Sequence, residues 1–181
     1  QPVIGTVHLA DDIGAGAQID IDIARPCQQV GERVADEYRD LLVEACRRCA
    51  LPVAIDVRLG AQQVFHAALP GSSADNDRWA SRKGRIAWHF GLPSLEVWRR
   101  YVGDDGDPMA FLTAFALPVD KYFPAGGAVP VTVGGAVVGV LAVSGLESSE
   151  DHALAVAAVR ELANDAEQSN ESEPRNEGVG E

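Results

Sequence analysis

The stretch Ala125–Gly145, AGGAVPVTVGGAVVGVLAVSG, is the most informative about the fold, because its two apolar runs flank the pair Gly134-Gly135. A Gly-Gly pair is a typical two-residue turn of a β-hairpin, and valines alternate towards it as they do in strands. The turn argues against a membrane-spanning helix, and a phosphate-binding loop would need a following Lys–Ser/Thr pair. The stretch therefore predicts a buried β-hairpin. Gly139 inside its second strand predicts a bulge or a close approach of two backbones.

The rest of the chain shows strand and helix patterns that place this hairpin in a larger domain. Alternating isoleucines indicate a strand, and apolar residues repeated every three or four positions indicate helices. The expected elements are a strand over 19–23, a helix over 26–49, strands over 52–58 and 62–69, a helix over 77–90 that Pro93 ends, short helical pieces within 94–121, the hairpin, and a closing helix that starts at a Ser148–Asp151 capping box. This order predicts an α+β domain with an antiparallel sheet covered by helices.

Length and charge set the domain organisation and exclude some partners. The chain has 181 residues, 46% of them hydrophobic, and a formal net charge of −12. We expect one domain over 19–163, a flexible N-terminal segment over 1–18 and a disordered acidic tail over 164–181. So acidic a protein is not expected to bind nucleic acid, because phosphate binding needs a basic surface.

The cysteine count and the hydropathy pattern predict the compartment. Three cysteines, Cys27, Cys46 and Cys49, cannot all pair within one chain, so reduced thiols in the cytoplasm are the simpler interpretation. The N-terminus lacks a basic region followed by an apolar stretch, and no uninterrupted apolar run reaches the length of a membrane helix. We therefore expect no membrane association.

Three stretches together resemble a known family. They are ALPGSSADNDRWASRK (68–83), the hairpin (125–145) and EDHALAVAAV (150–159). In order and spacing, roughly over 24–163, they are similar to the uncharacterised family within the haem-degrading-domain superfamily, the GlcG and HbpS-like proteins. The resemblance implies a profilin-like fold, a five-stranded antiparallel sheet covered by helices, and assembly into homo-oligomers. Some superfamily members bind haem or a corrinoid, and haem degradation has been proposed, whereas the most similar subgroup has no agreed activity.

The chain departs from the family pattern at two positions. The subgroup usually carries a His before the first Gly-Gly pair, where this chain has Ala125, and a second His where it has Gly91. If those histidines ligate a metal or haem in relatives, this chain has lost them. Neither a His-x₃-His pair nor another cluster at metal-ligand spacing is present, so we expect no dedicated metal site.

The helix expected over 77–90 carries the most informative polar residues. Arg78, Arg82 and Arg85 share one face, where they could hold an anion such as a propionate or a phosphate, or form salt bridges with acidic groups. Lys83 lies on the opposite, apolar side. It must either extend to solvent or pair with a buried acceptor, and it would then line a pocket or an interface.

The last helix and the two ends of the hairpin supply the other candidates. His152 lies in the first helical turn, where it could ligate haem as a neutral ring or bond to a nearby carboxylate. Ser144 and the amides after it could receive an anion. We expect the Gly126-Gly127 turn, the Ser144-Gly145 end and the Arg/Lys helix to converge on one pocket. The candidate ligand-binding residues are Arg82, Lys83, Gly126, Gly127, Ser144 and His152.

These observations predict a cytoplasmic, homo-oligomeric small-molecule-binding protein. Haem or another tetrapyrrole is the ligand class that the resemblance implies, and no catalytic residue can be assigned. Two alternatives stay open. One is an enzyme that degrades haem, and the other is an oligomeric scaffold without a ligand, whose glycines and aromatic residues serve subunit packing.

Overall fold

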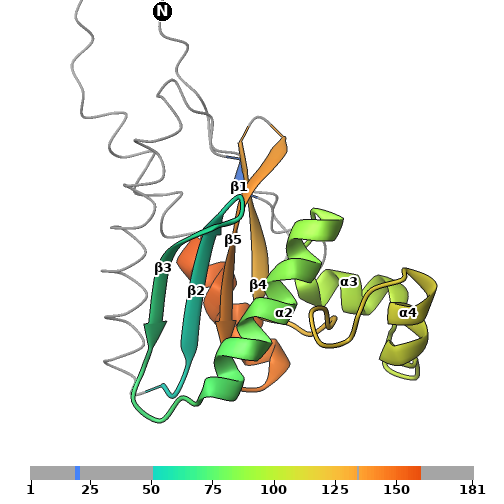
Figure 1. Ribbon diagram of the computed structural model, residues 1–181, viewed down its shortest axis with the longest axis horizontal. Coiled ribbons are helices and arrows are strands. Elements are labelled where there is room, and N and C mark those ends of the chain that lie inside the picture. The colour runs from blue at the N-terminus through green and yellow to red at the C-terminus, as the bar shows by residue number, and fades with distance from the viewer. Residues whose placement is uncertain (1–18, 21–50, 134, 160–181) are drawn as a thin grey trace, which may run out of the picture.

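The predicted hairpin lies at the centre of the sheet in the computed structural model, which describes residues 19–20, 51–133 and 135–159 (Figure 1). Its strands are β4, Ala128–Val133, and β5, Ala136–Ser144. The second predicted pair is also present as β2, Ala54–Leu59, and β3, Gln62–Ala68. Both hairpins follow from local signals, because apolar β-branched runs meet at short glycine-containing turns.

The sheet has the strand order β1-β4-β5-β2-β3. Its four long strands are antiparallel, as predicted, but the short strand β1, Ile19–Asp20, pairs parallel with β4. The expectation of five antiparallel strands was wrong for β1. Because β1 and β4 are far apart in the chain, no tight turn forces them to run in opposite directions. The predicted strand beyond residue 20, the helix over 26–49, the N-terminal segment and the acidic tail lie outside the described residues.

Gly139 marks both a bulge and a close backbone approach. Between β4 and β5, Val131 pairs with Gly139 while Thr132 pairs with Val137, so one residue of β5 is left over. A Cβ atom on Gly139 would lie 2.5 Å from the carbonyl oxygen of Arg58 on the neighbouring strand. Only glycine fits at this position, which confirms the interpretation of its place in the sequence.

Three helices follow the β2–β3 hairpin: α2, Ala74–Phe90; α3, Ser94–Tyr101; and α4, Pro108–Ala114. Helix α2 begins three residues before the predicted start because Ser73 is its N-cap, and the backbone N–H of Ser73 donates to the side-chain oxygen of Asn76. It ends at Gly91, which has a φ of 63°, rather than at Pro93. Pro93 instead caps α3.

The last helix is described over residues 148–159 and starts differently from the prediction. Its first hydrogen bond runs from the backbone N–H of Asp151 to the carbonyl of Glu147, whose own N–H donates to the side chain of Glu150. Glu147 is therefore the N-cap, and the expected Ser148–Asp151 capping box is absent. The Ser148 hydroxyl accepts instead from the backbone N–H of Gly126. Ser148 and Asp151, which the sequence pattern assigned to a capping box, thus accept hydrogen bonds from the backbone of Gly126 and Leu146.

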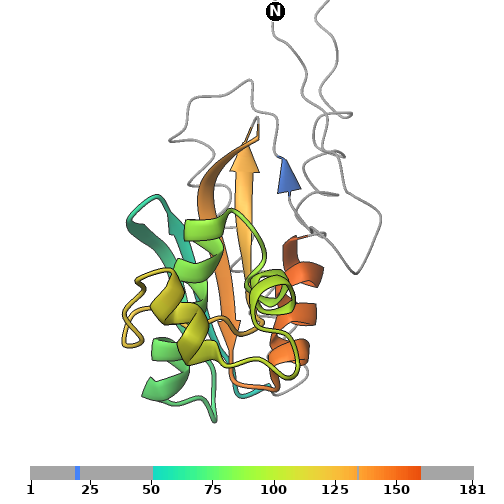
Figure 2. The same cartoon turned by 90° about the vertical axis from the view of Figure 1, so that its right-hand side faces the viewer.

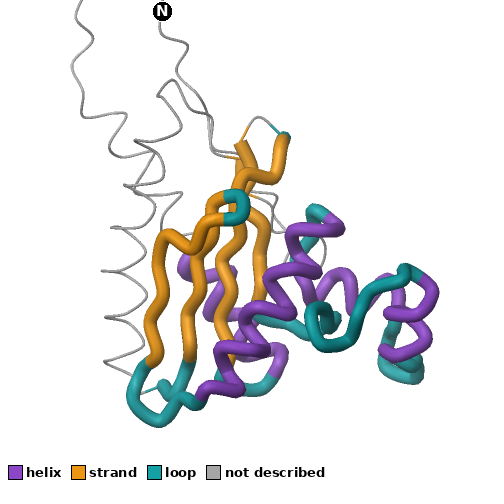
Figure 3. Tube along the Cα trace, viewed as in Figure 1, coloured by secondary structure: helices purple, strands orange, loops and turns teal. Residues whose placement is uncertain are grey.

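The sheet separates two helical layers (Figure 2). Alternate residues of β5 point to opposite faces, as they must in a strand. On one face, Leu141 and Val143 join the core of β2 and the last helix, and on the other face Val140 and Ala142 pack against Ala80 and Ala87 of α2. Helices α2, α3 and α4 gather on this second side (Figure 3). They share a core of Ile86, Val97, Phe111 and Leu112.

Candidate functional site

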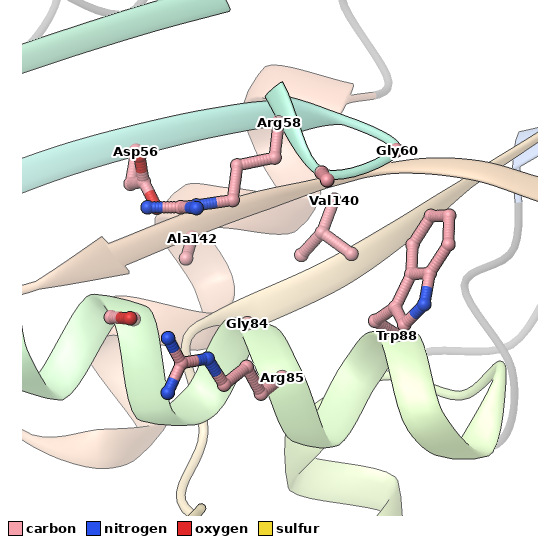
Figure 4. Close-up of a pocket in the computed structure, with 10 residues that line it drawn as sticks. Asp56, Arg58, Gly60, Gly84, Arg85, Trp88, Val140 and Ala142 are labelled. Carbon is pink, nitrogen blue, oxygen red and sulfur yellow. The ribbon is translucent and has the colours of Figure 1, made fainter. Parts of the chain in front are cut away.

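A groove with a volume of about 410 Å³ lies between α2 and the face of β2 and β5 that α2 packs against (Figure 4). The helix contributes residues three or four positions apart, which share one face. The strands contribute residues two positions apart, which also share a face. The lining residues are Asp56, Arg58, Gly60, Ala61, Ser81, Gly84, Arg85, Trp88, Val140 and Ala142.

Gly84 lets α2 pack closely on the sheet beside the groove. It occupies the turn of α2 that faces the groove floor, and a Cβ atom there would lie 3.7 Å from Cγ1 of Val140 and 3.8 Å from Cβ of Ala142. Both are ordinary van der Waals distances. The floor is therefore apolar, and α2 covers it closely enough that Val140 and Ala142 are only 4% and 1% exposed.

Arg58 is held by a carboxylate in the sheet. Its Nε donates to Oδ2 of Asp56 at 2.8 Å, and Nε2 of Gln63 donates to Oδ1 at 2.5 Å. Asp56 is only 6% exposed, whereas the side chain of Arg58 is 38% exposed. Within the described part of the chain, the two terminal nitrogens of Arg58 have no hydrogen-bond partner. These donors remain available to a ligand.

The groove is polar at one end and aromatic at the other. Figure 4 shows the guanidinium groups of Arg58 and Arg85 turned towards the same end, and Trp88 standing at the opposite end. Arg85 is exposed and has no hydrogen-bond partner among the described residues. Trp88 is 43% exposed. Two cations beside an apolar floor and an exposed ring suit a flat ligand with an anionic group at one end.

The predicted convergence of Lys83 with the hairpin is present, but the protein itself fills the space. Nζ of Lys83 donates to Oδ2 of Asp151 at 2.6 Å and to the carbonyl of Val143 at 3.0 Å. A Cβ atom on Gly127 would lie 2.8 Å from this Nζ. Burial lowers the pKa of Lys83, and the hydrogen bond to Asp151 acts in the opposite direction. Of the two possibilities for this lysine, pairing with a buried acceptor is the one realised.

The other hairpin candidates are also engaged within the protein. The backbone N–H of Gly126 donates to the hydroxyl of Ser148 at 2.6 Å. Ser144 is 4% exposed and lies opposite Ala54 in the sheet. Of the amides after Ser144, that of Leu146 donates to the carboxylate of Asp151 at 3.0 Å. These amides therefore bind a carboxylate of the same chain, that of Asp151. Binding of an external ligand by Gly126, Gly127 and Ser144 stays a prediction.

His152 is a half-buried side chain in the first turn of the last helix. Its Nδ1 is buried and has no hydrogen-bond partner in the described segments. Burial and the charge of Arg99 lower its pKa to about 4, while Glu96 acts in the opposite direction. The ring is therefore neutral at physiological pH, which is the form that ligates metals. It lies outside the groove, and its predicted role in ligand binding stays untested.

The expected stripe of arginines is divided. The guanidinium of Arg82 stacks on Trp79, with 4.5 Å from Cζ to the ring centroid, and on Phe123 at 5.2 Å. Its Nη2 donates to the carbonyl of Val119 at 2.8 Å. Arg82 thus fastens the segment after α4 to α2, whereas Arg85 lines the groove. Arg82 and Arg85 share one helix face by spacing, but they contact different parts of the protein.

Sequence reasoning missed Asp56, Arg58 and Trp88. One signal was available, because Asp56 and Arg58 are the charged residues of an otherwise apolar strand and their spacing puts both on the same face. The position of Trp88 opposite them depends on how α2 crosses the sheet. No local pattern contains that information.

An aromatic cluster outside the groove joins rings from the end of α2, from α3 and from α4 with its C-cap. Phe90, Tyr101, Phe111 and Phe115 are in mutual ring contact, with centroids 5.0 to 5.9 Å apart. Tyr101 and Phe115 remain 47% and 41% exposed, as does neighbouring Met109 at 47%. Exposed apolar residues gathered in this way often mark a surface that another protein covers.

The described residues contain neither a metal-binding cluster nor a membrane-spanning helix. None of the histidines, cysteines and carboxylates in these segments form a group of three or more that could hold a metal ion. The helices described there are all too short or too polar to cross a bilayer.

Comparison with known proteins gives consistent matches. The profile of the HbpS-like family, described as haem degrading protein HbpS-like, matches residues 31–160. A UPF0303 protein of Streptomyces avermitilis is 48% identical over 126 residues, which is 69% of this chain and 76% of that protein. The crystal structure of the Ybr137w protein has a TM-score of 0.64 at 28% identity, covering 78% of this chain and 80% of the other. The PduOC–haem complex has a TM-score of 0.60 at 15% identity, covering 77% and 94%.

Proposed function

Because this chain belongs to the HbpS-like family, we propose that it is a small-molecule-binding protein whose groove takes a flat anionic ligand of the tetrapyrrole class. One observation supports this above all. Arg58 and Arg85 turn towards one end of a groove with an apolar floor, and Trp88 stands at its other end (Figure 4). Carboxylates would bind the arginines, and the flat body of the ligand would stack on the exposed indole of Trp88.

The lining residues fit part of a haem group. The volume of about 410 Å³ lies within the roughly 300–1,000 Å³ of ligand pockets, at the lower end, so an edge of a large macrocycle would project outwards. The arginines fit its propionates. None of the described lining residues is a His, Cys, Met or Tyr, so the groove offers the iron no strong ligand. The proposal therefore rests on the carboxylates and the ring, and includes no chemistry at the iron.

The proposal also covers location and assembly. The odd number of cysteines supports a cytoplasmic protein with reduced thiols. The exposed rings of Tyr101 and Phe115 in the aromatic cluster support homo-oligomers, because water is an unfavourable environment for them. His152, whose ring is neutral and whose buried Nδ1 has no hydrogen-bond partner among the described residues, is a second contact candidate for a ligand at the last helix.

A haemin titration followed at the Soret band tests the proposal. We expect saturable binding by the native protein and about tenfold weaker binding by Arg58→Gln and by Arg85→Gln, because each loses a charge-assisted hydrogen bond. Arg78→Gln is the matched control, since Arg78 is an exposed arginine of α2 that does not line the groove. Unchanged affinity in both groove variants would overturn the assignment. Loss in His152→Ala instead would move the site to the last helix.

The same experiment separates the two other functions. The exposed rings of Tyr101 and Phe115 favour an oligomeric scaffold as the second candidate. A scaffold predicts a stable assembly and a spectrum identical to that of free haemin. A haem-degrading enzyme predicts that the Soret band disappears when a reductant and oxygen are added, whereas a binding protein keeps it.

A further inference from the structure

The groove contains a buried carboxylate that a binding site for anions would not be expected to have. Asp56 is 6% exposed, lines the groove and lies opposite Ala142 of the floor in the sheet. A negative charge at this point repels an anionic ligand. Unless it has another role, its presence contradicts the function proposed for the groove.

The hydrogen bonds of Asp56 indicate what that role is. The carboxylate contacts Arg58 through Nε alone, at 2.8 Å, so it does not occupy the outer edge of the guanidinium. A guanidinium has five N–H donors in a rigid plane, and four of them are on the two terminal nitrogens. With Nε tethered, those donors form a fork that a second carboxylate can accept bidentately.

Gln63 completes the arrangement from the next strand. Its Nε2 donates to Oδ1 of Asp56 at 2.5 Å, so each carboxylate oxygen has one partner and the carboxylate is fixed in orientation. The side chain of Arg58 is 38% exposed, and without the tether it would sample many rotamers. Holding it in one rotamer before the ligand arrives reduces the entropy lost on binding.

From this geometry we propose that Asp56, oriented by Gln63, is a positioning residue that presents Arg58 as a fork for one carboxylate of the ligand. The inference rests on the proposed function of the groove, and it specifies the ligand chemistry. The group recognised is a planar carboxylate attached to a flat apolar body, with Arg85 beside it and Trp88 at the far end. A neutral ester of the same body cannot use the fork.

The direction in which Asp56→Leu changes the affinity for an anionic ligand distinguishes a positioning role of Asp56 from a purely electrostatic one. In Asp56→Leu, a near-isosteric side chain removes the negative charge and the tether together. Electrostatics alone predicts tighter binding of an anion, whereas positioning predicts weaker binding. Asp56→Asn removes the same charge but keeps an oxygen that can accept from Nε of Arg58, so positioning predicts that it restores most of the affinity.

The experiment measures binding of metal-free protoporphyrin and of its dimethyl ester by fluorescence. We expect Asp56→Leu to weaken binding of the diacid about tenfold and to leave binding of the ester unchanged, with Asp56→Asn close to the native protein. Gln63→Ala should fall between them, and Gln62→Ala, an exposed neighbour on β3, serves as its control. Circular dichroism verifies that each variant is folded. If Asp56→Leu does not fold, the Gln63→Ala and Gln62→Ala pair decides the question.

The outcomes separate the two proposals. If the native protein binds neither porphyrin, the proposed function of the groove fails. If it binds the diacid and Asp56→Leu binds it equally or more tightly, the function stands and the positioning role of Asp56 is overturned. If every variant loses the ester as strongly as the diacid, Asp56 supports the shape of the groove rather than the fork, and the inference is likewise overturned.

Discussion

Replacing Lys83 by methionine tests whether the buried pair with Asp151 supports the fold. The two side chains are 3% and 2% exposed, and their charged atoms are 2.6 Å apart. Removing one partner of such a pair typically costs about 3–5 kcal/mol, because the other charge stays buried. In Lys83→Met the carboxylate keeps the N–H of Leu146 as a donor. We therefore expect the lower end of the range, about 3 kcal/mol in the free energy of unfolding.

Asp151→Asn and the double variant complete the cycle. Asp151→Asn leaves the ammonium of Lys83 with the Val143 carbonyl and a neutral amide, and should also cost about 3 kcal/mol. The double variant Lys83→Met/Asp151→Asn has no buried charge left. Its cost should be about 3–4 kcal/mol instead of the sum of about 6, which gives a coupling energy of about 2–3 kcal/mol.

Urea denaturation followed by far-UV circular dichroism, at pH 7 and one fixed protein concentration, measures these values. With a typical slope of about 2 kcal/mol per molar urea, each single variant should lower the midpoint by about 1.5 M. Lys121→Met is the matched control, since the other lysine of the chain is exposed and its loss should change stability by less than about 0.5 kcal/mol. A cost below about 1 kcal/mol for Lys83→Met, or strictly additive single effects, would refute the reasoning.

Two further predictions concern stability. Gly84→Ala removes glycine from the interior of α2 and adds a methyl group at ordinary contact distances. The free energy of unfolding should therefore rise by about 1 kcal/mol. A lower thermal midpoint in the variant would contradict this prediction. The pKa of His152 is lowered to about 4 from 6.5, so between these values the unfolded state binds more protons, and the stability present above pH 6.5 is lost as the pH falls towards 4. Because the ring is partly exposed, this loss of stability should be about 1–2 kcal/mol. The urea midpoints at pH 7 and pH 4.5 should therefore differ less in His152→Leu than in the native protein. If the two proteins show equal differences, His152 is not the cause.

The elements that the sequence predicts well are those whose signals are local. The β4–β5 hairpin follows from valines that alternate towards a Gly-Gly pair, and the bulge at Gly139 follows from a glycine within a strand. The start of α2 was misplaced by three residues because the contribution of Ser73 depends on the reach of one side chain, Asn76. The direction of β1 was wrong because no turn connects it to its neighbour.

The site was harder to predict, because it depends on contacts between distant segments. An amphipathic pattern shows that Lys83 faces the protein interior. It does not show that the acceptor is Asp151, 68 residues later. The groove likewise requires β2 to pair with β5 and α2 to cross both strands. The only local signal for the groove was the pair of charged residues, Asp56 and Arg58, within an otherwise apolar strand.

The close packing at Gly127 links three positions that are far apart in the chain. Lys83 belongs to the helical layer on one side of the sheet and Asp151 to the layer on the other. They meet just before the start of β4, where position 127 has no side chain: a Cβ atom there would lie 2.8 Å from Nζ of Lys83 and 2.9 Å from Cβ of Asp151. A change at any one of the three leaves a clash or an unpaired buried charge. The three positions are therefore coupled, and the residue at one restricts what the other two can hold.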